Sequence, residues 1–203
     1  MDAQSQYMSM FFPNADLELA KNLKSFHPPY FLDLFFRLAT HLGDSRLFLI
    51  LIPLISLGLW RICSRYIALG FCVCAVGSAF TCEGIKHLVQ RPRPDMSLAR
   101  VEKLPSSPSF PSGHTMVSTT VFGSLAVLGT FLTRRKTIRL FLTAVGIFIP
   151  ILVGLTRMYL GVHYLSDVLG GWLGGCVFVI ILHFWIRKQI PKPTETTPPS
   201  VES

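Results

Sequence analysis

Residues 140–155 read LFLTAVGIFIPILVGL, a stretch without a charged side chain that would be apolar on every face of a helix. A helix in a soluble protein carries a polar stripe on the side that meets water. Half of the chain's 203 residues are hydrophobic and only 15% are charged, which is also unusual for a soluble domain. The stretch therefore predicts a membrane-spanning helix.

Further apolar stretches flank this one and cover residues 47–60, 66–82, 115–133 and 168–186. A bilayer core about 30 Å thick needs roughly 17 to 25 largely apolar residues in a helix, so residues 47–60 must tilt or borrow flanking residues. Residues 115–133 and 168–186 are rich in Gly, Ser, Thr and Ala, as membrane helices are where they pack closely. The sequence predicts an all-α integral membrane bundle with five transmembrane helices and leaves a sixth open.

The two ends of the chain differ from this apolar region. Residues 28–43 are apolar on one side and polar on the other. That pattern suits a helix lying in the membrane interface, although the sequence alone leaves open whether it spans. The C-terminal residues are rich in Pro, Thr, Ser and Glu and are expected to be disordered. We divide the chain into an N-terminal region with an interfacial amphipathic helix (1–46), a transmembrane domain that carries the catalytic residues (47–190) and a disordered tail (191–203).

Basic residues gather at the ends of the apolar stretches and in one short loop, residues 134–139. The formal net charge of +8 could indicate a nucleic-acid partner, but no continuous soluble basic face is predicted to carry it. Because cytoplasmic loops collect Lys and Arg, the side with this loop and the C-terminus is predicted to be cytoplasmic. We expect a multi-pass protein of the cell (inner) membrane, in contact with membrane lipids and without nucleic acid. The sequence does not indicate an oligomeric state.

Three polar clusters are predicted to meet on the opposite, extracytoplasmic side, at the ends of separate spans. Their sequences are KHLVQRPRP (86–94), PSGH (111–114) and TRMYLGVHYLSD (156–167). Each contains residue types that an anionic substrate needs. This placement predicts one composite site.

In the third cluster, His163 and Asp167 are four residues apart, so they share a helix face if the last helix begins here. Asp167 would then hold the Nδ1 proton of His163 and direct a basic Nε2 at phosphorus, as in an oriented nucleophile. A surface ion pair is the alternative interpretation of this spacing. The nearby Arg157 and the predicted approach of His114 favour the catalytic one.

Fixed cations stabilise the charge on the equatorial oxygens during phosphoryl transfer. Lys86, Arg93 and Arg157 would supply them. Snorkelling at the membrane interface is the alternative for Lys86 or Arg93 alone. It does not explain Pro94, which is expected to rigidify the loop that carries Arg93.

The second cluster precedes a predicted helix, where free backbone amides and the helix dipole favour an anion. Ser112 and Gly113 would bind phosphate there, and a simple helix cap is the compatible alternative. His114 would act as the general acid that protonates the leaving oxygen, and then as the base that activates water.

No metal or cofactor is expected. The carboxylates Glu83, Asp95, Glu102 and Asp167 lack the spacing of a magnesium or zinc site, and no CxxC pair occurs among the five cysteines. We interpret the cysteines as small buried apolar residues. Glu83 lies near the membrane end of a helix, where a carboxylate usually has a partner, and is expected to pair with a basic residue of the site.

Together the clusters resemble the three motifs of the type 2 phosphatidic acid phosphatase (PAP2) superfamily. These motifs are a Lys separated by six residues from Arg-Pro, then Pro-Ser-Gly-His, then Ser-Arg with a His six residues later and an Asp four beyond. All three occur in order between Lys86 and Asp167, but Thr156 stands where the family usually has Ser. Its hydroxyl can still bond phosphate or a neighbouring residue. The resemblance implies a metal-independent membrane lipid phosphatase, and many relatives have six spans.

The expected substrates are undecaprenyl diphosphate, phosphatidylglycerol phosphate, phosphatidate and lipid A phosphates. A polyprenyl diphosphate is slightly favoured because the predicted site faces outward and no added soluble domain would hold a large head group. One alternative is a vanadate-dependent haloperoxidase, which has a similar pocket but belongs to a soluble group. The other is a non-catalytic membrane protein that binds or transports phosphate, against which the intact His163, His114 and Asp167 argue.

Overall fold

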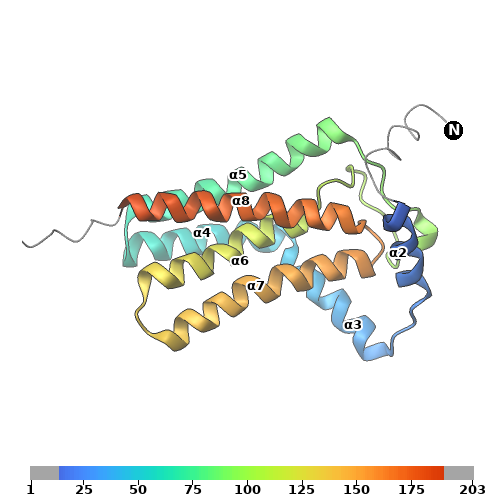
Figure 1. Cartoon of the computed structure of the whole chain (residues 1–203), viewed down its shortest axis with the longest axis horizontal. Coiled ribbons are helices and arrows are strands. Elements are labelled where there is room, and N and C mark those ends of the chain that lie inside the picture. The colour runs from blue at the N-terminus through green and yellow to red at the C-terminus, as the bar shows by residue number, and fades with distance from the viewer. Residues whose placement is uncertain (1–13, 190–203) are drawn as a thin grey trace, which may run out of the picture.

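The structure, a computed structural model, describes residues 14–189, which form helices and connecting segments without a strand in that range. Long helices lie side by side (Figure 1): α4 (Ser45–Ile62), α5 (Arg65–Val89), α6 (Gly113–Leu132), α7 (Lys136–Tyr159) and α8 (Leu165–Gln189). These five are each long and apolar enough to cross a membrane. The predicted all-α bundle of five spans is confirmed, and residues 14–189 contain no sixth.

All five spans are longer than the apolar stretches that predicted them, and α4 and α5 show how their ends are set. α4 starts at Ser45, where the carboxylate of Asp44 caps the helix by accepting a 2.9 Å hydrogen bond from the amide of Arg46. This span therefore borrows flanking residues, as expected. α5 continues past residue 82 to Val89 and ends where Gln90 adopts a left-handed conformation with φ of 50°. The last turns of α5 consequently carry charged residues of the first cluster.

The central helix is α6, which packs against α7 and α8 along much of its length and also contacts α5. Glycine residues, which have no side chain, allow these helices to approach closely. A Cβ atom at Gly146 of α7 would lie 2.8 Å from the carbonyl oxygen of Phe122, and one at Gly175 of α8 would lie 2.7 Å from that of Met116. The Gly-rich and Ala-rich character of the predicted spans thus corresponds to direct contact between helix backbones.

The two ends of the bundle differ in charge and in the segments that they contain. The α4–α5 turn, the α6–α7 turn and the end of α8 lie together at one end (Figure 1). The other end holds the loop between α5 and α6, which includes the short helix η2 (Met96–Leu98), and the α7–α8 turn. The first end carries a basic group of side chains: Arg61, Arg65, Arg134, Arg135, Lys136, Arg139, Arg187 and Lys188.

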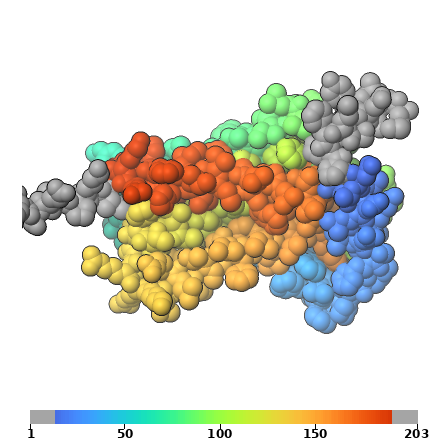
Figure 2. Space-filling model, viewed as in Figure 1, coloured from blue at the N-terminus to red at the C-terminus, as the bar shows by residue number. Residues whose placement is uncertain are grey.

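Residues 14–43 of the N-terminal region lie at the second end, as the space-filling view in Figure 2 shows. They contain α2 (Asn14–Ser25), α3 (Tyr30–Ala39) and the short helix η1 (Thr40–Gly43). The ten residues of α3 extend about 15 Å, too short for a span. The hydroxyl of Tyr159 anchors α3 by donating a 2.6 Å hydrogen bond to Asp33. α3 nevertheless exposes a row of large apolar side chains: Tyr30, Phe31, Leu34, Phe35 and Leu38.

The structure tests the prediction for the cysteines but does not test the prediction for the C-terminal tail. The five cysteines are free thiols, and Cys74 and Cys82 are buried as predicted, but Cys63 and Cys176 are exposed. The prediction was wrong for these two because a lipid-facing surface accepts small apolar residues as readily as a core does. The tail at 191–203, predicted to be disordered, and the first 13 residues of the N-terminal region lie outside the described residues.

Candidate active site

All three predicted clusters contribute to one cavity of about 720 Å³ at the second end of the bundle. It is lined there by Lys86, Arg93, Gly113, His114, Arg157 and His163. These residues come from the end of α5, the α5–α6 loop, the start of α6, the end of α7 and the α7–α8 turn. Folding therefore brings together side chains that are up to 77 positions apart, counted from Lys86 to His163.

His163 lies in the α7–α8 turn, two residues before α8 begins at Leu165. The condition given for this pair, that the last helix begins at His163, is therefore not met, but the expected pair is present. Its Nδ1 atom lies 3.4 Å from Oδ2 of Asp167, and both side chains are buried. Gly161 makes the turn possible, because its φ is 66° and a Cβ there would overlap the carbonyl oxygen of Leu98.

The surroundings of His163 define its tautomer. Nη1 of Arg93 lies 3.2 Å from Nε2 of His163. A guanidinium can only donate, so Nε2 accepts and the ring proton is on Nδ1, facing Asp167. Burial lowers the pKa of His163 to about 4, against the opposing effect of its hydrogen bond with Asp167. The ring is therefore neutral near pH 7, with a lone pair on Nε2.

Arg93 is held by the backbone of neighbouring segments. Its Nε donates to the carbonyl of Ser107 and its Nη1 to that of Val162, each over 2.8 Å. Burial lowers the pKa of Arg93, although nearby Asp167 opposes this effect. Carbonyl groups fix the position of the guanidinium, but they carry no net charge that would compensate its positive charge.

Arg157 is the cation whose contacts best indicate what the cavity binds. Its Nη1 donates over 2.8 Å to Oγ1 of Thr40, and only 8% of the residue is exposed. Its Nε is buried and has no hydrogen-bond partner among residues 14–189. Within the same range neither Arg157 nor Arg93 forms an ion pair with a carboxylate. A buried, uncompensated charge costs several kcal/mol, so this arrangement favours binding of an anion in the cavity.

Lys86 differs from the two arginines because it has a carboxylate partner. Its Nζ lies 2.8 Å from Oε1 of Glu83, which confirms the predicted pairing of Glu83 with a basic residue. Lys86 is buried, whereas the side chain of Glu83 is more than half exposed. A Cβ atom at Gly113 would lie 3.6 Å from Nζ of Lys86, so the missing side chain leaves room beside the ammonium group.

Ser112 joins the starts of α6 and α8. Its amide donates over 3.0 Å to the carbonyl of Asp167, and its hydroxyl accepts a 2.9 Å bond from Thr115. The prediction of a free amide is therefore wrong for Ser112. The helical hydrogen bonds of α6 begin with the amide of Met116, so the amides of Gly113 and His114 precede them at a helix end whose geometry suits an anion.

Thr156 and Pro94 are the remaining predicted residues of the site. The hydroxyl of Thr156 donates over 2.7 Å to the carbonyl of Val153 within α7, so in this structure it bonds a neighbouring residue. Pro94, a residue of the α5–α6 loop, is fully buried. No group of three or more His, Cys, Asp or Glu side chains within residues 14–189 could hold a metal. Metal independence stays a prediction.

Sequence reasoning missed several polar partners of the site. Asp167 accepts hydrogen bonds from Nη1 of Arg91 over 2.5 Å and from the hydroxyl of Ser109. Arg91 also binds Asp16, and Arg157 binds Thr40. The repeated Arg-Pro of the first cluster was a signal for Arg91. Asp16 and Thr40 had none, because their contacts exist only once the N-terminal region has docked.

The PAP2 superfamily model matches residues 65–191. Phosphatidylglycerophosphatase B of Bacillus subtilis (strain 168) is 34% identical over 150 residues, which are 71% of this chain and 71% of that protein. An undecaprenyl-diphosphatase of Sulfolobus acidocaldarius is 37% identical over 75 residues, which are 37% of this chain and 32% of that protein.

Solved structures give the same result. The transmembrane PAP2-type phosphatidylglycerolphosphate phosphatase from Bacillus subtilis matches with a TM-score of 0.77 and 29% identity, over 93% of this chain and 94% of that one. LpxE of Aquifex aeolicus matches with a TM-score of 0.57 and 26% identity, over 83% of this chain and 94% of that one. The shared fold, the matched residues and the three motifs at one cavity show that this chain belongs to the PAP2 superfamily.

Proposed function

We propose that this protein is a membrane lipid phosphatase that hydrolyses the phosphate ester or diphosphate of a lipid through a phosphohistidine on His163. The uncompensated, buried guanidinium of Arg157 carries this proposal. It faces the same cavity as Nε2 of His163 and Arg93, so a phosphate attracted by the cations lies beside a nitrogen lone pair. An anion site and a nucleophile in one cavity are what phosphoryl transfer requires.

The reaction begins when the Nε2 lone pair of His163 bonds to phosphorus and the bond between phosphorus and the leaving oxygen breaks. Asp167 stabilises the positive ring through Nδ1. His114 gives its proton to the leaving oxygen, and the phosphate dianion favours the protonated form of His114 that this step needs.

Water completes the cycle. Its oxygen bonds to phosphorus while His114 takes one of its protons, and the phosphorus–nitrogen bond breaks with return of the electron pair to Nε2. Orthophosphate leaves, and both histidines recover their starting states. Arg93, Arg157 and the amides of Gly113 and His114 offset the charge on the phosphoryl oxygens in both steps.

The shape of the cavity supports a lipid substrate. From the cationic end it continues between α4 and α5, where its walls are apolar. These walls include Phe48, Leu49, Ile52 and Pro53 of α4, Val76 and Ala79 of α5, and Val117 of α6. An amphiphile fits such a cavity, with its phosphate at the cationic end and its chain between the helices. This apolar part of the cavity, which we call the apolar arm, favours a lipid phosphatase over a soluble haloperoxidase.

Phosphatidylglycerol phosphate is the first candidate substrate. The similarity to the Bacillus phosphatidylglycerophosphatase extends over 71% of both chains, whereas the undecaprenyl-diphosphatase match covers 32% of that relative. This extent outweighs the slight preference for a polyprenyl diphosphate that the sequence alone gave. We also propose that the basic end of the bundle is cytoplasmic, that the site is extracytoplasmic and that the apolar row of α3 lies in the interface.

Phosphate release from purified protein in detergent with excess EDTA tests the proposal. The substrates are phosphatidylglycerol phosphate, undecaprenyl diphosphate, phosphatidate and lipid A phosphate. We expect turnover of at least one and fastest release from phosphatidylglycerol phosphate. Binding of these lipids without any release would instead support the non-catalytic alternative.

A further inference from the structure

We propose that Asp16 of α2 is a positioning residue for phosphoryl transfer, which acts on His163 through Arg91 and Asp167. The inference rests on the proposed function. It assigns a role in the reaction to a residue of the N-terminal region, outside the three motifs and outside residues 65–191 that match the family.

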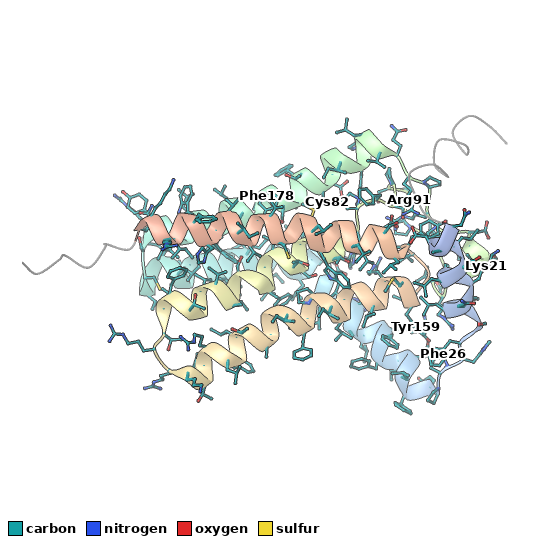
Figure 3. The ribbon with its side chains drawn as sticks, viewed as in Figure 1. Lys21, Phe26, Cys82, Arg91, Tyr159 and Phe178 are labelled. Carbon is teal, nitrogen blue, oxygen red and sulfur yellow. The ribbon has the colours of Figure 1, made fainter. Side chains whose placement is uncertain are left out.

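A continuous chain of contacts carries the inference. Oδ2 of Asp16 lies 2.8 Å from Nη2 of Arg91, and Nη1 of Arg91 lies 2.5 Å from Oδ1 of Asp167. The other oxygen of Asp167 faces Nδ1 of His163. All four residues are buried, with exposures of 4%, 4%, 0% and 3% in that order. Figure 3 shows Arg91 where α2, the start of α8 and the loop after α5 meet.

Asp16 also holds the backbone next to Asp167. Its Oδ1 accepts a 3.1 Å hydrogen bond from the amide of Ser166, in the first turn of α8, and its Oδ2 accepts the hydroxyl of the same residue. Nη1 of Arg91 donates to that hydroxyl over 2.6 Å. Asp16 therefore caps α8 from another helix and contacts both Arg91, which binds Asp167, and the residue directly before Asp167.

Charge gives this contact a catalytic consequence. Within residues 14–189, the charged or titratable groups around His163 are Arg93 from the α5–α6 loop, His114 from α6, Arg157 from α7 and Asp167 from α8. Two of them are arginines and one is a carboxylate, so the balance opposes the positive ring that forms on attack. Arg91 alone would neutralise Asp167. With Asp16 present, two carboxylates share Arg91 and a net negative charge remains to stabilise the ring.

A buried ion pair with a purely structural role is the competing explanation. Two variants distinguish the positioning role from the structural role. Asp16→Asn removes the charge of the side chain but keeps its size. Glu18→Gln is a matched control on the exposed face of the same helix. Measurements are kcat and KM for phosphate release, the melting temperature in detergent, and the pH midpoint of the His163 ring signal in histidine-labelled protein.

For Asp16→Asn we expect a roughly tenfold lower kcat with KM within about threefold of wild type, as for loss of an outer carboxylate partner of a functional histidine. The midpoint of His163 should move to lower pH, because a lost negative charge disfavours the protonated ring. Asp16→Glu should restore part of kcat. Glu18→Gln should match wild type, because water and salt screen its charge.

An active wild type with an unchanged kcat in Asp16→Asn would overturn this inference and leave the proposed function intact. A reduced kcat with an unmoved His163 midpoint would assign Asp16 a structural role and would also overturn it. An inactive wild type would refute the proposed function itself. If Asp16→Asn does not fold, Arg91→Lys carries the test, since lysine keeps the charge but cannot bridge both carboxylates in a fork. Wild-type kcat in that variant overturns the inference.

Discussion

Nη1 of Arg93 lies 3.2 Å from Nε2 of His163, so the lone pair that we propose as the nucleophile faces a cation in the free protein. We expect a phosphate that binds Arg93 to take over that donor and release the lone pair. The same arginine can thus keep the ring in the correct tautomer before binding and stabilise the phosphoryl oxygens afterwards.

His163→Ala should abolish turnover while the protein remains folded. His114, the other histidine of the cavity, is assigned the proton transfers, so no side chain of the three motifs is left to replace the nucleophile and the loss should exceed about a hundredfold. Wild type quenched during turnover should carry phosphate that is labile to acid and stable to base. His27→Ala, at an exposed position, is the matched control and should retain wild-type rates. Residual activity above one hundredth of wild type would refute the nucleophile assignment.

The ring signal of His163 should titrate with a midpoint near pH 4, because burial lowers its pKa to about that value. The ring therefore stays neutral and nucleophilic as the pH falls through 6, and is lost as a nucleophile only below about 4. Titration of histidine-labelled free enzyme, with the signal assigned by its absence in His163→Ala, measures this without interference from substrate ionisation. A midpoint near 6.5, the ordinary value for histidine, would contradict the burial of the ring.

Activity should survive excess EDTA, because Arg93, Arg157 and Lys86 supply the positive charge that a metal would otherwise provide. Vanadate should inhibit, since its trigonal-bipyramidal adduct with His163 resembles the transferring phosphoryl group. The measurements are initial rates with chelator, with chelator plus excess magnesium, and with increasing vanadate. Activity that disappears in EDTA and returns only with magnesium would disprove metal independence.

In intact cells, a membrane-impermeant maleimide should label a cysteine at Ser106 but should label one at Thr137 only after permeabilisation. Both positions are exposed, at opposite ends of the bundle. Ser106 is preferable to the adjacent Ser107, whose backbone and hydroxyl hold Arg93. The native cysteines are replaced first, and that background must remain unlabelled. The reverse pattern would place the site in the cytoplasm without altering the proposed chemistry.

The bundle was predictable because lipid demands long apolar helices, and residues 140–155 meet that demand on every face. The ends of the helices were less predictable than the bundle. The apolar pattern stops at Cys82, yet α5 continues to Val89, because Glu83 and Lys86 can pair on consecutive turns where the helix leaves the apolar region. Periodicity reports the environment of side chains and does not report where backbone hydrogen bonding ends.

The candidate site was predictable to the extent that its chemistry is encoded in local motifs. Arg93, Arg157 and His163 were assigned from residue type and spacing, and they line one cavity. The groups that hold them were not predictable. Thr40 reaches Arg157 across 117 positions of sequence, and Asp16 reaches Ser166 across 150, so these contacts depend on how the N-terminal region docks.

The apolar arm of the cavity, between α4 and α5, is the proposed position of the lipid chain, and this position would determine how the enzyme encounters its substrate. A lipid that enters there diffuses within the plane of the bilayer, so the encounter rate depends on its mole fraction among neighbouring lipids and not on its bulk molarity. Added detergent or inert lipid should slow turnover by surface dilution even when the amounts of enzyme and substrate are constant. Of the two products, orthophosphate escapes to water, while the dephosphorylated lipid stays in the membrane and competes for the same arm.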